Sequence, residues 1–128
     1  MKFIENLSND PRYNLAFEEY CFKNLPKDDD YVILWVNDPA IIIGKNQNTL
    51  EEVNLAYTKE NGISIVRRVT GGGAVYHDLG NLNFSFIVNS KGPKVIDFKK
   101  YNVPIIKALN RLGISAGLKG TCTRRHTA

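Results

Sequence analysis

The stretch RRVTGGGAVYHDLGNLNFSF spans residues 67–86 and combines two arginines, three consecutive glycines and a His-Asp pair. Glycine permits positive φ and lets a ligand approach the backbone without a Cβ in the way. Successive N–H groups in such a turn bind anions, and a guanidinium binds phosphate or carboxylate bidentately. Because side chains alternate along a strand, only one of Arg67 and Arg68 can point toward the glycines. The stretch predicts an anion site; the alternative is an ordinary hairpin turn with solvated arginines.

Two common phosphate-binding motifs do not account for the glycines. The Walker pattern G-x-x-x-x-G-K-[ST] does not occur in the chain. The dinucleotide pattern G-x-G-x-x-G starts at Gly71 and Gly73 but meets Tyr76 where its last glycine should stand. The residues around the glycines must therefore decide between a ligand site and a turn.

Strands and helices are predicted to alternate along the chain. The predicted strands are residues 2–6, 31–36, 40–44, 63–68 and 82–88. The predicted helices are residues 11–25, 49–60 and 97–112, the last kinked or restarted at Pro104. Short connections favour antiparallel neighbours, as between residues 31–36 and 40–44. This pattern predicts an α/β chain of the α+β type, with a mixed, largely antiparallel sheet packed with helices.

Helical spacing on residues 11–25 predicts an apolar stripe toward the core. The stripe consists of Tyr13, Phe17, Tyr20, Cys21 and Leu25. Cys21 is expected to pack in the core rather than to act in catalysis, because its neighbours on the stripe are apolar. On the strand at residues 82–88, Asn83 and Ser85 are expected on the polar face, where either could contact a ligand or only form structural hydrogen bonds.

Composition excludes several protein classes. The chain has 128 residues and a net charge of +4, so one domain or part of one is expected. Residues 114–128 hold three basic residues and no acidic one; subtracting these charges leaves +1 for the rest. We therefore expect no nucleic-acid partner. Two cysteines without a C-x-x-C motif argue against structural zinc. The chain starts without a signal-peptide pattern and has no long apolar run, which predicts a cytoplasmic protein without a membrane partner.

Three ordered blocks of the sequence resemble the lipoate–protein ligase A family. Residues 67–85 fit the family pattern R-R-x-[ST]-G-G-G-x-V-[YF]-H-D-x-G-[NT]-x-x-[FY]-[ST]. The other two blocks are NLAFEEY at residues 14–20 and LWVNDPAIIIGKNQN at residues 34–48. The family belongs to a larger group with biotin ligases and lipoyl or octanoyl transferases, so the resemblance implies a fold like that of class II synthetases and biotin ligases.

The resemblance implies a two-step reaction. Lipoate and ATP, with Mg²⁺, give lipoyl-AMP and pyrophosphate; the lipoyl group then passes to a lysine of a lipoyl domain in 2-oxoacid dehydrogenase complexes or of the glycine cleavage H protein. The positions expected to bind ATP are Arg68, Gly73, Ala74, Val75 and Tyr76. Those expected at the lipoate are Trp35, Gly72, His77 and Asn83, where Trp35 is equally compatible with a plain core role. His77 is expected to be oriented by Asp78 rather than to act as a general base.

The resemblance stops after Gly120. The family continues with R-N-D-L, a strand and a Lys-x-x-G-x-[AS] block, whereas this chain ends with TCTRRHTA at residues 121–128. We expect residues 1–120 to form the N-terminal part of a catalytic domain that is incomplete at its C-terminus, followed by an unrelated tail. No catalytic residue is assigned, and the 128-residue chain alone is expected to be inactive. The alternatives are an octanoyl or lipoyl transferase and a non-catalytic module that binds nucleotide or lipoate.

Overall fold

The computed structural model describes residues 1–89 and 98–118. The chain divides into two units, Met1–Asn89 and Ser90–Ala128, and each is described by itself. The predicted tail at residues 121–128 lies outside the described residues. Among the residues that the structure describes, none of the helices combines the length and apolarity needed to cross a membrane.

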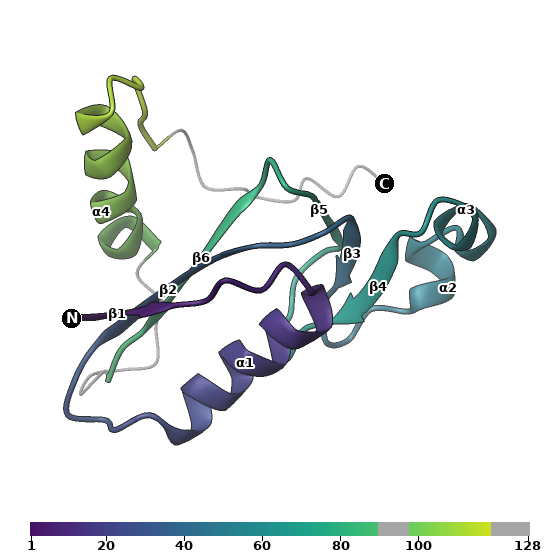
Figure 1. Cartoon of the computed structure of the whole chain (residues 1–128), viewed down its shortest axis with the longest axis horizontal. Helices are drawn as coiled ribbons and strands as arrows, with labels where there is room; N and C mark the ends of the chain where they lie inside the picture. Colours follow the sequence, from purple (N-terminus) through teal and green to yellow (C-terminus); the bar gives the residue numbers. More distant parts are fainter. Residues whose placement is uncertain (90–97, 119–128) are drawn as a thin grey trace, which may run out of the picture. The chain divides into compact units, whose positions relative to one another are not determined.

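The first unit contains two three-stranded sheets (Figure 1). The first sheet has the order β1 (Lys2–Glu5), β2 (Tyr31–Val36), β6 (Leu82–Ile87), and the second β4 (Ser64–Arg67), β3 (Ala40–Ile43), β5 (Val75–His77). β1 pairs with β2 and β3 with β4 in parallel, whereas β2–β6 and β3–β5 are antiparallel. The mixed α/β class is confirmed, and helices supply the crossovers that parallel pairs require.

β2 and β3 do not form the predicted antiparallel pair. Figure 1 shows β2 running on into β3 through a bend, so the two strands belong to different sheets. β6 and β5 run back along them, with Val36 opposite Leu82 and Ala40 opposite His77. Between β5 and β6, residues 78–81 form a turn in which the N–H group of Asn81 donates to the carbonyl oxygen of Asp78 at 3.0 Å. The prediction was wrong because a short connection here continues a bent strand instead of reversing the chain.

Helix α1 (Pro11–Asn24) covers the first sheet. Asp10 caps it by accepting hydrogen bonds from the N–H groups of Arg12 and Tyr13, and aspartate is among the residues preferred at this position. The core cluster consists of Cys21, Ile33 and Trp35, with Ile4, Phe17, Leu25 and Ile87 packed against it. The predicted stripe is wrong at two positions, because Tyr13 and Tyr20 are 54% and 62% exposed. The polar Asn14, at 1% exposure, takes the place expected for an aromatic residue.

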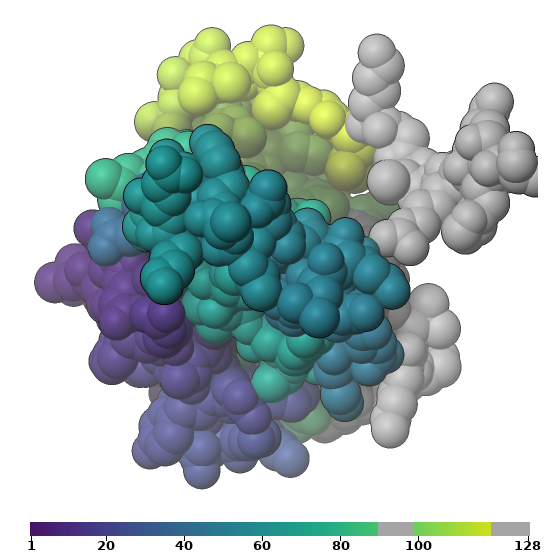
Figure 2. Space-filling view, turned by 90° about the vertical axis from the view of Figure 1, so that its right-hand side faces the viewer, coloured from purple at the N-terminus to yellow at the C-terminus, as the bar shows by residue number. Residues whose placement is uncertain are grey.

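The single helix predicted at residues 49–60 is two short helices. α2 (Thr49–Glu52) is capped by Asn48 and α3 (Leu55–Glu60) by Asn54. Each asparagine oxygen accepts a hydrogen bond from a backbone N–H group inside its helix, and the second cap restarts the helix. The two helices lie at the end of the unit that faces the viewer in Figure 2.

In the second unit, α4 (Phe98–Arg111) runs through Pro104 as one element. A fresh start at Pro104 is therefore excluded, although proline lacks the N–H group for the usual helical hydrogen bond. Gly113, with φ of +81°, follows the helix, and glycine is the residue most often found in this conformation at a helix end. The expected helix start at Asp97 lies outside the described residues.

Candidate functional site

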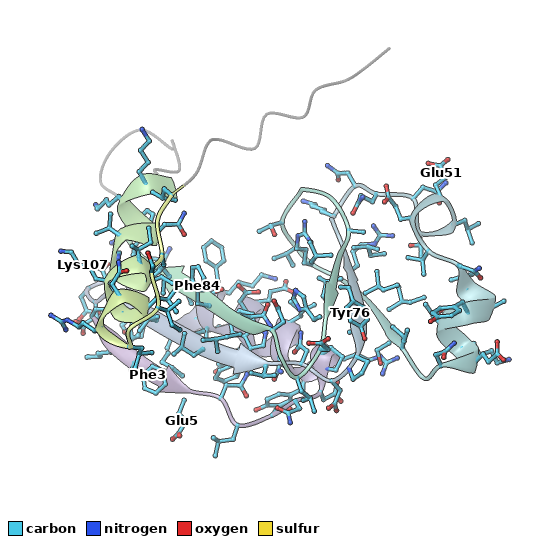
Figure 3. The ribbon with its side chains drawn as sticks, turned by 90° about the horizontal axis from the view of Figure 1, so that it is seen from above. Phe3, Glu5, Glu51, Tyr76, Phe84 and Lys107 are labelled. Carbon is cyan, nitrogen blue, oxygen red and sulfur yellow. The ribbon has the colours of Figure 1, made fainter. Side chains whose placement is uncertain are left out.

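An open cleft of about 490 Å³ lies beside the glycine stretch in the first unit. It brings together predicted site residues from β2, β5, β6 and the segment between β4 and β5. These are Trp35, Arg68, Val75, Tyr76, His77 and Asn83. Figure 3 shows Tyr76 far from Phe3 and Glu5, which belong to β1 at the other end of the unit. The predicted residues Gly72, Gly73 and Ala74 do not line the cleft themselves but form the loop next to it.

Helix α1 contributes cleft residues that the sequence reading did not assign. Leu15 and Glu18 line the cleft from this helix. Ser85 donates a hydrogen bond to Oε1 of Glu18, which joins β6 to α1. Leu15 and Glu18 both lie in the block NLAFEEY that carries part of the family resemblance, so this block, rather than the helical periodicity, could have indicated them.

Arg68 shapes the glycine loop, residues 70–74. Its Nη2 donates hydrogen bonds to the carbonyl oxygens of Gly71 at 3.0 Å and Gly73 at 2.8 Å. Nη1 lies 3.4 Å from the carbonyl oxygen of Ile42 on β3. Within the loop, Gly72 has a positive φ of +114°, which glycine tolerates. A guanidinium thus turns the loop carbonyls toward itself.

The unpaired N–H groups of the glycine loop indicate a candidate binding site for an anion. Within the described residues, no hydrogen bond is donated by the N–H groups of Gly71, Gly72 or Gly73. Unpaired neighbouring N–H groups, beside a half-buried arginine, make a concave donor surface. This arrangement is more than a hairpin turn, since β5 after the loop pairs with β3 and not with β4 before it.

Arg67 points away from the glycine loop, as strand alternation predicts. Its Nη1 donates to the carbonyl oxygens of Gly44 at 2.9 Å, Lys45 at 3.2 Å and Gln47 at 2.8 Å. Nη2 donates to the hydroxyl of Thr49 at 2.9 Å. Arg67 therefore holds the segment between β3 and α2, and the adjacent arginines have separate partners.

His77 is held by Asn37 and not by Asp78, so the predicted His-Asp pair is wrong. Nδ2 of Asn37 lies 2.9 Å from Nδ1 of His77. Asp78 instead accepts a hydrogen bond at 2.9 Å from the N–H group of Gly80 in the next turn. Burial, and then the charge of Arg68, hold the pKa of His77 below its ordinary value, and Asp78 opposes them. The ring is therefore stabilised in its neutral form.

Trp35 is both a core residue and a wall of the cleft, so the predicted core role is confirmed and the predicted contact with lipoate stays a prediction. It is 6% exposed and packs in the core cluster. Its indole N–H group has no hydrogen-bond partner among the described residues, which is uncommon for a buried donor. Asn83 is its register partner on β6, and paired residues share a face of the sheet. The face with Asn83 and Ser85 is thus the α1 side.

Metal ligands do not gather in the described part of the chain. No group of three or more His, Cys, Asp or Glu side chains there could hold a metal ion.

This chain is similar in sequence and in structure to known lipoate-protein ligases. B. subtilis lipoate-protein ligase LplJ is 59% identical over 121 residues, which are 94% of this chain but 37% of LplJ. P. falciparum LipL1 in complex with lipoate superposes with a TM-score of 0.80 at 35% identity, covering 94% of this chain and 38% of LipL1. A lipoate-protein ligase A bound with ATP superposes with a TM-score of 0.81 at 35% identity, covering 95% and 50%.

The chain thus spans 37% of the length of LplJ, and its similarity to that relative is distributed over nearly all of its own length. Residues 10–126 match the lipoyl protein ligase A/B catalytic domain. This match includes α1, the strands β2 to β6 and the glycine loop, the elements that form the cleft or lie beside it. The chain therefore belongs to the lipoyl protein ligase A/B catalytic domain family.

Proposed function

We propose that the cleft and the glycine loop bind lipoate and ATP for a lipoate–protein ligase reaction. The observation that supports this most directly is that Arg68 and the buried Trp35 line one cleft, with the glycine loop held beside it by Arg68. Arg68, Gly73, Ala74, Val75 and Tyr76 bind the nucleotide in this proposal. Trp35, Gly72, His77 and Asn83 contact the lipoate. Similar proteins solved with lipoate and with ATP support both ligands.

The proposed chemistry needs anion stabilisation. A lipoate oxygen attacks the α-phosphorus of ATP, the bond to the β-phosphate breaks, and lipoyl-AMP and pyrophosphate form. Negative charge grows on the phosphoryl oxygens, so N–H donors and a guanidinium fixed beforehand lower the barrier. Mg²⁺ is proposed to arrive with ATP and to neutralise the leaving pyrophosphate. The free N–H groups of the glycine loop and the nearby Arg68 suit this role.

The second step is proposed to transfer the lipoyl group to a lysine. The lysine amine attacks the acyl carbon, AMP leaves, and an amide forms. The proposed acceptors are lipoyl domains of 2-oxoacid dehydrogenase complexes and the glycine cleavage H protein. We propose these acceptors from the family relationship alone. This chain spans 37% of the length of LplJ.

The test measures binding and turnover separately. Calorimetry on this chain with lipoate and with ATP–Mg²⁺ should give saturable binding that Arg68→Ala weakens. For turnover, we define the extended ligase as residues 1–120 of this chain continued with the corresponding remainder of LplJ. It should catalyse lipoate-dependent exchange of pyrophosphate into ATP. An extended ligase that is folded and inactive, together with a chain that binds neither ligand, would rule out the proposed function.

The alternatives predict different outcomes. Binding of lipoate without exchange in the extended ligase would favour a non-catalytic binding module. A cysteine-based transferase would work without ATP through an acyl-enzyme intermediate. Cys21 does not suit that role, because it is 3% exposed and burial raises the pKa of its thiol.

A further inference from the structure

Three residues from the three family-like blocks form one buried polar chain, which we call the relay: Asn14, Asn37 and His77. Nδ2 of Asn14 donates to Oδ1 of Asn37 at 2.8 Å, and Nδ2 of Asn37 lies 2.9 Å from Nδ1 of His77. Asn14 and Asn37 are 1% and 0% exposed. The relay crosses the bend where β2 ends and β3 begins, and His77 lines the cleft.

Backbone carbonyl groups decide which way each amide of the relay faces. Nδ2 of Asn14 also donates to the carbonyl oxygens of Ser8 at 2.9 Å and Val36 at 3.1 Å. A carbonyl oxygen only accepts, so the NH₂ group of Asn14 must face this side. Asn37 must then turn its oxygen toward Asn14 and its NH₂ group toward His77. Nδ1 of His77 faces a donor and has to accept.

The geometry points to an assignment that goes beyond the proposed ligands: the relay fixes His77 as the neutral tautomer with the proton on Nε2. Asn14 and Asn37 are then positioning residues, and Nε2–H is a hydrogen-bond donor at the cleft. Protonation of Nδ1 would set one N–H group against another, so the relay and burial both favour the neutral ring. The charged neighbours of the ring are Arg68 and Asp78.

This inference rests on the proposed function for the ligand that receives the hydrogen bond. We assign the acceptor to a carboxyl oxygen of the bound acid, because lipoate is the ligand proposed to contact His77. The role of His77 is to orient and polarise that oxygen as a neutral donor. A general base at this position would need Nε2 free of its proton.

The tautomer is measured directly by nitrogen NMR on the whole chain. The sequence has two histidines, so His126→Gln leaves His77 as the only imidazole. At about pH 8, above the ordinary histidine pKa, ¹⁵N–¹H spectra should show a protonated Nε2 and a bare Nδ1. A protonated Nδ1, or a mixture of tautomers, would overturn the inference without any ligand.

Two substitutions separate the relay from local charge. Asn37→Asp replaces the donor with a carboxylate, so the proton should move to Nδ1 and the pKa of His77 should rise by about one unit or more. Asp78→Asn is the matched control: it removes a neighbouring charge and should lower the pKa while the proton stays on Nε2. A tautomer that changes in Asp78→Asn would instead support the His-Asp pair. If Asn37→Asp does not fold, the tautomer of His77 in the original chain and in Asp78→Asn still tests the inference.

Lipoate binding tests the donor role separately. His77→Gln keeps an NH₂ donor near the Nε2 position, whereas His77→Asn keeps only the acceptor near Nδ1. We expect His77→Asn to weaken the lipoate Kd about tenfold and His77→Gln to weaken it less. If lipoate binds but the Nε2–H resonance of His77 does not shift, His77 does not donate a hydrogen bond to lipoate. Absence of any lipoate binding would reject the proposed function and leave the tautomer result standing.

Discussion

The carbonyl oxygen of Gly72 occupies the space where a side chain at Gly44 would begin. A Cβ atom at Gly44 would lie 2.1 Å from that oxygen, far inside van der Waals contact. The N–H group of Lys45 donates to the carbonyl oxygen of Thr70 at 2.9 Å in the same contact. The glycine loop is thus seated against the end of β3, and Gly44 is required for its position although it lies far away in sequence.

Gly44→Ala should displace the glycine loop. The backbone carbonyl of Gly72 cannot yield as a flexible side chain does, so we expect a loss of about 1–3 kcal/mol in the free energy of unfolding. Urea denaturation measures this loss, and calorimetry measures the expected weakening of ATP binding. Gly71→Ala is the control, because its Cβ would meet no atom within 4 Å. Equal effects of the two substitutions would contradict the contact.

Gly72→Ala should damage nucleotide binding through Arg68. The φ of +114° strains any residue with a side chain, and the added Cβ would lie 2.5 Å from Nη2 of Arg68. The guanidinium has to move, and its hydrogen bonds to the loop carbonyls are lost with it. We expect about tenfold weaker ATP binding, from the loss of roughly one charge-assisted hydrogen bond. Unchanged ATP affinity, with Gly71→Ala again as the control, would show that the loop does not hold the nucleotide.

The two arginines should differ in what their loss affects. In the extended ligase, Arg68→Ala should slow adenylation by about 10²–10³-fold if its guanidinium stabilises the phosphoryl oxygens. Arg67→Ala should slow it less than about tenfold but lower the free energy of unfolding by about 1–3 kcal/mol, because Arg67 holds the segment before α2. Pyrophosphate exchange and urea denaturation measure the two effects. Equal losses of activity would refute the separate assignments.

The sequence predicts those features that depend on neighbouring residues. The opposite directions of Arg67 and Arg68 follow from strand alternation, and the start of α1 follows from Asp10 and Pro11. The positive φ at Gly72 follows from the run of glycines. Each of these properties is set within a few residues along the chain.

Features that depend on distant residues could not be predicted in this way. The partner of His77 is Asn37, forty positions away, whereas the adjacent Asp78 was the natural expectation. The bend between β2 and β3 has no local signal that separates it from a hairpin turn. The burial of Asn14 on α1 also depends on its hydrogen bond to the carbonyl oxygen of Val36, at the end of β2. The relay therefore becomes visible only when the three sequence blocks are placed together in space.

Cys21 should be dispensable for the chemistry. It packs against Ile33 and Trp35, and burial, followed by the charge of Glu18, raises the pKa of its thiol. A buried neutral thiol is a poor nucleophile. Cys21→Ala in the extended ligase should keep adenylation within about threefold while costing about 1 kcal/mol of stability through lost packing. Loss of adenylation in a variant with full stability would contradict the packing role and show that the thiol takes part in the chemistry.

His77 should make stability depend on pH in a defined direction. Its folded pKa is lowered by burial and by Arg68, so just below the ordinary value of about 6.5 the unfolded chain binds a proton that the folded chain does not. Stability should therefore fall as the pH decreases through about 6.5 toward the folded pKa, and this contribution should level off below it. Urea denaturation between about pH 5 and 8 measures the slope of the free energy of unfolding against pH.

Two variants test whether His77 causes this slope. His77→Gln removes the titrating group and should make the slope smaller. Asp78→Asn removes the charge that raises the pKa of His77, so the loss of stability should extend to lower pH. Any contribution of His126 cancels when variants are compared. Identical slopes for the original chain and His77→Gln would show that the ring is not shielded as the relay requires.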